Sequence, residues 1–349
     1  MKSTTRSWAS RCAAALLVGL TIARIARAAD DSPSSYEFAL DDQTELTLEP
    51  IVDNPKSWEL DLRQYGTAAQ GQVLVFMGRA EQKDSGLFEL NNEYDGKSHI
   101  VRFRGNPAKG PVEVTSENLL LDSGQPAKIA GTFQPITPAA RLERTKSRWQ
   151  KADAVLNEVY ASVRAEVGKA GESKLRDLQR GRISIRDNRA TFEAHGAEKP
   201  ESLPVYWDTM LGETVSNISF LKIYTGRDVP KGLTGSYGDA SGGGGLDLEE
   251  TPKGLKFSMT AVRGASLHEG EISGIAQLKG NRATYKQSSK EAAADGHKPA
   301  ELTFTMSAGH IVHVDEKNTA YFGGAGVYFA GDYYKSGPLK APIDLSKEQ

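Results

Sequence analysis

The chain has 349 residues, with 43 Lys and Arg against 45 Asp and Glu, 35 Gly and a single Cys. A hydrophobic content of 38% with 25% charged residues is typical of a folded globular protein of two or three domains, and argues against a disordered or membrane-spanning chain. One Cys excludes an internal disulfide framework, a CxxC redox centre and a thiolate zinc cage. The net charge of −2 argues against a strongly basic nucleic-acid binder.

Residues 1–28 have the pattern of a secretory signal peptide. Lys2, Arg6 and Arg11 precede an apolar stretch from Cys12 to Ala23, and Ala26-Arg27-Ala28 supplies small residues at the cleavage positions. The apolar stretch is too short for a stable bilayer anchor. The sequence therefore predicts an exported bacterial protein, periplasmic or extracellular, with no integral membrane segment after signal cleavage.

Cleavage of this leader would change the charge of the chain. It removes five basic residues and no acidic one, which leaves 38 basic against 45 acidic residues and a net charge of −7. Residues 29–137 alone hold 18 acidic and 9 basic residues, a net charge of −9. A surface of this kind favours cationic partners.

Residues 29–137 show β patterns. Apolar and polar residues alternate around Leu46 and Leu48, from Trp58 to Leu62, and from His99 to Arg104. The continuous apolar run from Val73 to Met77 suits a strand that is buried on both faces. Turn residues recur between these segments, so we expect an acidic β sandwich or barrel.

Residues 138–227 change to a helical period. Pro138 can open a helix whose apolar face runs from Trp149 to Val167, and Gly168 and Gly171 would end it. We expect a second helix capped by Ser173 and a third from about Pro204 to Tyr224. Three helices with short connections predict a small bundle.

Residues 228–336 are rich in Gly and return to short alternating segments, which predicts a C-terminal antiparallel β barrel. The fold class expected for the whole chain is therefore α+β multidomain. After Lys335 we expect a poorly ordered tail, residues 337–349. The expected strands are Leu246–Leu248, Leu255–Val262, Ile272–Leu278, Ala283–Tyr285, Leu302–Met306, Ile311–Val314 and Val327–Tyr333.

Few motifs point to catalysis. The run Ser241–Gly245 lacks the Lys-Ser/Thr of a phosphate-binding loop and precedes a strand, which favours a turn. His310 and His313 would lie on opposite faces of a strand and could not bind one metal ion. The sequence therefore predicts no metal site, no cofactor and no catalytic residue. A carboxylate pair for glycoside cleavage stays open, because any two acids can converge in space.

A polar group in the helical segment has two interpretations. Asp153 and Asn157 lie one turn apart on the first helix, and Arg186 and Asp187 are adjacent in the second. Such side chains can lock helix packing through hydrogen bonds, or they can form a recognition site. Both interpretations stay open at this point.

These residues belong to a longer pattern. Ala152–Tyr160, Leu175–Arg180 and Ile185–Asp187 resemble the LprI-type lysozyme-inhibitor domain, in which an AD-x-x-LN-x-x-Y helix precedes an L-x-x-x-Q helix that ends in Arg-Asp. The resemblance covers about residues 141–225, and Thr234–Lys335 looks like the β domain that often follows. The site residues that it implies, as a binding or structural motif, are Asp153, Leu156, Asn157, Tyr160, Gln179, Arg186 and Asp187.

The chain also departs from this family. Arg182 stands where the family usually has Trp, and Ala190 stands where it has Cys. The disulfide that commonly joins the helices in the family is therefore absent, and packing alone must hold them.

The resemblance implies a non-enzymatic exported binding protein that inhibits lysozyme by occluding its glycan cleft. The acidic surface would attract such a cationic enzyme. The alternative is a carbohydrate-binding or structural cell-envelope protein that presents aromatic residues such as Tyr321, Phe322, Tyr328 and Tyr333 to cell-wall glycan. A hydrolase is the second alternative, and we expect no nucleic-acid partner.

Overall fold

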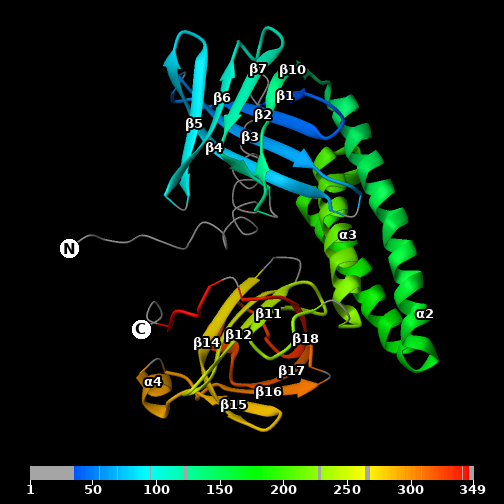
Figure 1. The fold of residues 1–349 in the computed structure, drawn as a ribbon, viewed down its shortest axis with the longest axis vertical. Coiled ribbons are helices and arrows are strands. Elements are labelled where there is room, and N and C mark those ends of the chain that lie inside the picture. The colour runs from blue at the N-terminus through cyan, green and yellow to red at the C-terminus, as the bar shows by residue number, and fades with distance from the viewer. Residues whose placement is uncertain are drawn as a thin grey trace. The chain divides into compact units, whose positions relative to one another are not determined.

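The structure is a computed structural model that describes residues 35–345 except for positions 55, 69, 95, 122–123, 196, 227–228, 264–267, 295, 308 and 340 (Figure 1). The expected signal peptide and its Cys lie outside the described residues. The chain divides into two units. The first unit holds residues up to Gln64 and Val73–Ile136, and the second holds Tyr65–Gln72 and everything from Thr137 onward.

The first unit is a closed eight-stranded antiparallel barrel. A two-stranded sheet of β8 and β9 lies between β7 and β10 in the chain. The strands are β1 (Tyr36–Ala39), β2 (Thr44–Pro50), β3 (Ser57–Tyr65), β4 (Gln72–Asp84), β5 (Leu87–Tyr94), β6 (Lys97–Arg104), β7 (Val112–Glu117), β8 (Leu119–Leu120), β9 (Pro126–Ala127) and β10 (Ala130–Pro135).

Large apolar side chains fill this barrel. Leu46 on β2 lies opposite Leu62 on β3, and both are buried together with Phe38, Phe103 and Phe133. An eight-stranded barrel is just wide enough for side chains to fill its interior. The expected sandwich or barrel is therefore a barrel with a solid core.

The expectation that Val73–Met77 is buried on both faces is wrong. In β4, Leu74 is buried whereas Val75 is 37% exposed. A strand of a closed barrel has one inward and one outward face, so only alternate residues of this apolar run reach the core.

The second unit begins with a long helical segment. The helix α2 (Pro138–Glu193) starts at Pro138 after Thr137, whose hydroxyl accepts a hydrogen bond from the Ala140 N–H. A short 3₁₀ helix η1 (Pro200–Ser202) leads to α3 (Pro204–Tyr224), which has the predicted bounds. Ser173 lies inside α2 and does not cap a helix, so that expectation is wrong.

Gly168 divides α2 into two arms, Pro138–Val167 and Lys169–Glu193. Its φ of 60° and ψ of −169° are not helical. The arms run antiparallel, because Arg186 pairs with Asp153 at 3.2 Å although 33 residues separate them. In one straight helix that separation would be about 50 Å. The predicted break at Gly168 is confirmed, and with α3 the arms form the expected three helices.

We expect Gly168→Ala to lower the free energy of unfolding of the second unit by about 1–3 kcal/mol, because this backbone conformation is essentially restricted to glycine. No atom stands within 4 Å of an added Cβ, so the cost is one of backbone strain alone. Gly181→Ala is the matched control, since Gly181 has helical geometry and equally open space. That control should stabilise the helix by up to about 1 kcal/mol. Urea unfolding measures both, and equal effects would contradict the strain argument.

The rest of the second unit is another closed eight-stranded antiparallel barrel, in which each strand pairs with its neighbours in the chain. A short helix α4 (Ser289–Ala294) and a 3₁₀ helix η2 (Ala320–Phe322) lie in its connections. The strands are β11 (Gly235–Asp239), β12 (Gly244–Thr251), β13 (Gly254–Arg263), β14 (His268–Lys279), β15 (Arg282–Lys286), β16 (Glu301–Ser307), β17 (Ile311–Lys317) and β18 (Gly331–Gly337).

The predicted C-terminal barrel is confirmed, with corrections at its end. The last strand is Gly331–Gly337 and not Val327–Tyr333. Tyr333 consequently lies inside the barrel with no exposed surface, and Phe322 packs against the same core. Of the four aromatic residues expected at the surface, only Tyr321 and Tyr328 are largely exposed, at 56% and 48%.

The expected disorder after Lys335 is also contradicted, in part. Ile343 is buried, and its N–H donates to the Glu249 carboxylate at 2.9 Å. The Lys256 ammonium donates to the Ile343 carbonyl oxygen at 3.3 Å. This part of the tail therefore lies against β12 and β13, because an apolar side chain and two polar contacts hold it.

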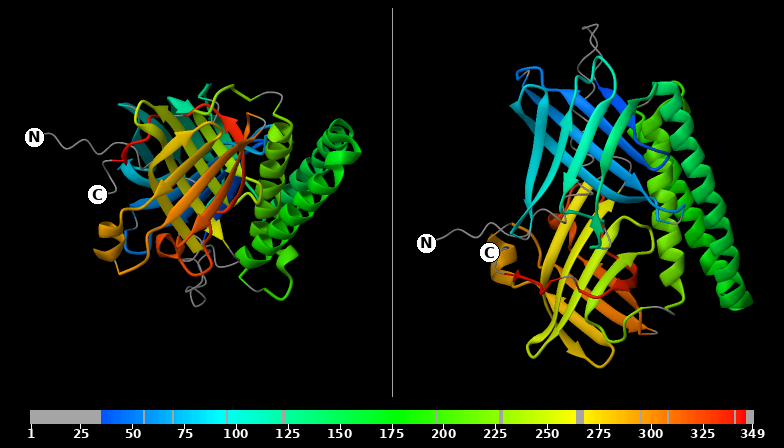
Figure 2. Two further views of the ribbon diagram at one scale, coloured as in Figure 1. Left: turned by 90° about the horizontal axis from the view of Figure 1, so that it is seen from below. Right: turned by 45° about the horizontal axis from the view of Figure 1, so that its top comes forward.

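The helices pack along one side of the second barrel (Figure 2). Tyr334 on β18 is buried against Phe220 and Tyr224 of α3, with ring centroids 5.1 and 5.3 Å apart. Leu156 of the first arm belongs to the same apolar cluster. Among the described residues, no helix combines the length and apolar character needed to cross a membrane.

Candidate functional site

The structure brings six of the seven expected site residues to one small hollow on the α2 hairpin. The hollow has a volume of about 340 Å³, and Asp187 lies outside its lining. The six expected residues in its lining are Asp153, Leu156, Asn157, Tyr160, Gln179 and Arg186, and the lining also includes Arg176, Arg180 and Ile183.

Hydrogen bonds join three polar residues of this hollow, Asp153, Asn157 and Arg186. Arg186 donates to Asp153 at 3.2 Å across the hairpin and to Asp187 at 2.9 Å. The Asn157 amide donates to the Asp153 backbone oxygen at 2.9 Å. This network supports the interpretation that the motif ties the two arms together.

The remaining three residues of the motif have different surroundings. Leu156 is buried in the apolar core between the helices, and Tyr160 packs against that core. Gln179 is 8% exposed, and its Oε1 accepts no hydrogen bond from the described residues. Leu156 and Tyr160 therefore act through packing.

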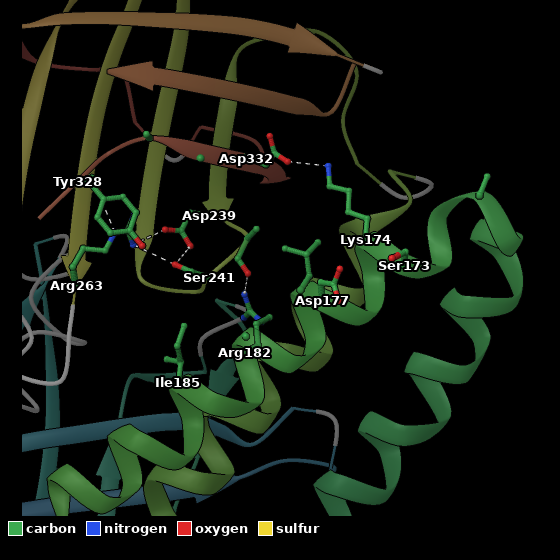
Figure 3. Close-up of a pocket in the computed structure, with 16 residues that line it drawn as sticks. Ser173, Lys174, Asp177, Arg182, Ile185, Asp239, Ser241, Arg263, Tyr328 and Asp332 are labelled. Carbon is green, nitrogen blue, oxygen red and sulfur yellow. Dashed lines mark hydrogen bonds and ion pairs between the residues drawn. The ribbon is translucent and has the colours of Figure 1, made fainter. Parts of the chain in front are cut away.

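A second, larger cavity lies between the second arm of α2 and the second barrel (Figure 3). Its volume is about 820 Å³, and we call it the helix–barrel cleft. The helix contributes Lys174, Asp177 and Arg182 to its walls. The barrel contributes Asp239, Ser241, Arg263, Tyr328 and Asp332.

A buried ion pair forms the barrel wall of the cleft. Arg263 Nη1 and Asp239 Oδ2 lie 2.6 Å apart, and their side chains are 6% and 5% exposed. Asp239 also accepts hydrogen bonds from the Ser241 hydroxyl at 2.7 Å and from the Gly242 N–H at 2.6 Å. Residues Ser241 to Gly243 thus form a turn, as predicted, whereas Gly244 and Gly245 already belong to β12. The N–H groups of Gly242 and Gly243 bind the Asp239 carboxylate.

The half-exposed side chain of Tyr328 packs against the Arg263 side chain of this ion pair. The Arg263 guanidinium lies 4.5 Å from the centre of the Tyr328 ring, and Arg263 Nε donates to the Tyr328 carbonyl oxygen at 3.0 Å. The ring is therefore held in place although 48% of the residue is exposed. Figure 3 shows the ring at the barrel side of the cleft.

A charged chain connects the helix to the barrel at the edge of the cleft. Lys174 Nζ donates to Asp332 Oδ2 at 2.9 Å, and His313 Nδ1 donates to Asp332 Oδ1 at 2.7 Å. The hydrogen bond to Asp332 raises the pKa of His313, against the opposing effect of burial. At Asp332, burial raises the pKa of the carboxyl group, but the hydrogen bonds from Lys174 and His313 outweigh burial, so the pKa is lowered overall.

These shifts predict a pH-dependent stability. The pKa of His313 in the folded chain lies above its ordinary value of 6.5. Its charged form therefore stabilises the fold fully below pH 6.5, and this stabilisation is lost as the pH rises through the folded pKa. We expect His313→Gln to destabilise the chain at pH 5.5 and to have no effect at pH 8.5. The difference should stay below about 1 kcal/mol, because half the side chain is exposed and solvent screens the pair. Thermal unfolding of both proteins at both pH values tests this, and an equal effect at the two would contradict it.

Sequence reasoning missed the helix–barrel cleft. In the sequence, Arg182 stands out only as a departure from a family pattern and Tyr328 only as one of four expected surface aromatics. Asp239 and Arg263 lie in the expected β domain without a distinguishing pattern. No local pattern shows that these residues meet, because they come from α2, β11, β13 and the segment before β18.

Comparison with known proteins does not assign a family. No protein-family model, no curated protein and no solved structure matches the chain. The resemblance to the LprI-type domain therefore stays a prediction.

Proposed function

We propose that the chain is an exported carbohydrate-binding protein whose ligand lies in the helix–barrel cleft. The observation that carries this proposal is the half-exposed Tyr328 ring, which is fixed on Arg263 in one wall of the 820 Å³ cavity. The C–H face of a sugar ring packs against an aromatic ring, and its hydroxyls bond to charged and polar groups such as those of Ser241 and Lys174. The volume lies in the range of ordinary small-molecule sites.

The surroundings of two carboxylates in the cleft, Asp239 and Asp332, favour sugar binding over glycoside hydrolysis. A glycosidase needs a carboxylic acid whose pKa is raised, so that it can protonate the leaving oxygen. Asp239 is instead surrounded by donors from Arg263, Ser241, Gly242 and Gly243. Asp332 has a lowered pKa, because Lys174 and His313 hold its charged form. Asp332 is therefore poorly suited to donate a proton near neutral pH, and the Asp239 carboxylate is already bound by groups of the protein.

The experiment is a glycan array with the purified chain, followed by retention on peptidoglycan. We expect Tyr328→Ala to weaken the retention about tenfold, the effect of losing one aromatic contact of about 1.4 kcal/mol. Tyr321→Ala is the matched control, because Tyr321 is 56% exposed and does not line the cleft. The proposal fails if no glycan is retained, or if Tyr328→Ala binds as well as the control.

Lysozyme inhibition is a second candidate, and the charge of residues 29–137 favours it. A net charge of −9 on this segment would attract a strongly cationic enzyme, with a rate that falls as salt is added. The mechanism would be occlusion of the glycan cleft of the enzyme. A cell-wall lysis assay tests it, and undiminished lysis at micromolar protein would exclude it.

A further inference from the structure

Arg182 is a buried cation in the wall of the helix–barrel cleft. The residue is 6% exposed, and its guanidinium lies 4.4 Å from the centre of the Phe220 ring. Nη1 donates to the Ala240 carbonyl oxygen at 3.0 Å, and Nη2 donates to the Ser216 hydroxyl at 3.2 Å. These contacts place the group between α2, α3 and the turn after β11, as Figure 3 shows for the barrel side.

The other two cations of the cleft, Lys174 and Arg263, each have a carboxylate partner, unlike Arg182. Lys174 lies 2.9 Å from Asp332, and Arg263 lies 2.6 Å from Asp239. Arg182 forms no ion pair with any described carboxylate, and its Nε has no hydrogen-bond acceptor among the described residues. A buried charge without an ionic partner is unfavourable, so this guanidinium would gain from an anion supplied by a ligand.

The charge state of Arg182 supports this argument. Burial lowers its pKa to about 10, against the opposing influence of Asp239 and Glu213. The group therefore stays charged at neutral pH, in surroundings that disfavour the charge. Gly242 packs closely on the guanidinium, since a Cβ there would lie only 3.1 Å from both terminal nitrogens.

We infer that the ligand of the helix–barrel cleft is an acidic sugar and that Arg182 binds its carboxylate. This inference depends on the proposed function and names its substrate class. A contact chain from Tyr328 through Arg263, Asp239 and Ala240 leads to Arg182, so the cleft offers a stacking ring on its barrel wall and an unpaired cation on its helix wall. A planar guanidinium matches a carboxylate in geometry and charge.

The charge balance of the cleft favours a single negative charge. Lys174 and Arg263 are already paired within the cleft, which leaves Arg182 alone to be balanced. The third carboxylate of the lining, Asp177, is 67% exposed and lies 3.9 Å from Arg180. A monoanionic carboxylate would neutralise Arg182, whereas a phosphate dianion would add charge beside three aspartates.

Calorimetric titration with two matched sugar pairs tests the inference. N-acetylmuramic acid is N-acetylglucosamine with an added lactyl carboxylate, and glucuronic acid is glucose with the C6 alcohol oxidised. We expect the wild-type chain to bind the acidic member of at least one pair tenfold or more tightly than the neutral member. In Arg182→Gln this preference should fall to about one.

Two further variants keep the test decisive. Arg182→Lys retains the charge without the planar fork, so it should fold and show at least a threefold smaller preference. Arg176→Gln is the control, because Arg176 is an exposed arginine of the same arm that does not line the cleft, and it should keep the full preference. Thermal unfolding establishes that each variant is folded.

The outcomes separate the inference from the proposed function. If neutral and acidic sugars bind equally to the wild-type chain, the inference is wrong and carbohydrate binding stands. If the preference persists in both Arg182 variants, another group binds the carboxylate and the inference is wrong. If no sugar binds and no glycan is retained, the proposed function fails together with the inference.

Discussion

Replacement of Asp239 by Asn should lower the free energy of unfolding of the second unit by about 3–5 kcal/mol, the usual effect of breaking a buried ion pair. The substitution keeps the size of the side chain but leaves the Arg263 guanidinium, 6% exposed, without its carboxylate. It also weakens the acceptor that holds the turn at Ser241 and Gly242. Urea unfolding followed by circular dichroism measures the change.

A double-substitution cycle identifies the pair as the cause. Arg263→Met leaves Asp239 without its cation, and the two substitutions together should cost clearly less than the sum of the single effects. Glu301→Gln is the control within the same barrel. It breaks an ion pair of similar length, 2.7 Å to Lys286, but these side chains are 34% and 62% exposed. The control should be indistinguishable from the wild-type chain, and an equally small effect of Asp239→Asn would contradict the role given to the buried pair.

Much of the local structure could be predicted from the sequence. The alternation at Leu46 and Leu48 predicts β2, and Pro204 and Tyr224 are the observed ends of α3. The break at Gly168 follows from the preference of glycine for non-helical backbone. Each of these signals depends on residues close in the chain, which explains why they can be read without the fold.

The cleft depends on contacts between distant residues, and these were not predictable. The carbonyl that binds Arg182 belongs to Ala240, 58 residues away. From the sequence, an arginine in a helix is expected at the surface. In the structure the turn after β11 covers Arg182. Pairing between distant residues also explains why the last strand is Gly331–Gly337 and not the predicted Val327–Tyr333. The pairing of Val312 with Tyr333 determines which face of β18 lies inside the barrel.

The hairpin motif shows the limit of a resemblance. It correctly groups Asp153, Asn157 and Arg186, which meet across the two arms. Their partners are mostly one another, so the group explains how a disulfide-free hairpin is held. The residues of the proposed ligand site lie instead on the other side of the second arm, where Lys174 and Arg182 face the barrel.

Phe103→Ala and Phe257→Ala form a matched pair of core substitutions that tests the division into two units. Phe103 has no exposed surface and stacks on Phe88 with ring centroids 4.8 Å apart, in the first barrel. Phe257 is equally buried in the second barrel, with its ring 5.0 Å from those of both Tyr285 and Phe304. Each substitution should cost about 3–5 kcal/mol through lost burial and an unfilled cavity.

The two effects should appear in different unfolding transitions, because each barrel has its own apolar core. In scanning calorimetry of the full chain, Phe103→Ala should lower the midpoint temperature of the first unit's transition by roughly 10 °C or more, while the midpoint of the second unit's transition is unchanged. Phe257→Ala should do the reverse. A single transition that both substitutions lower equally would show that the barrels unfold cooperatively, and the helix–barrel cleft would then depend on the integrity of the first barrel as well as the second.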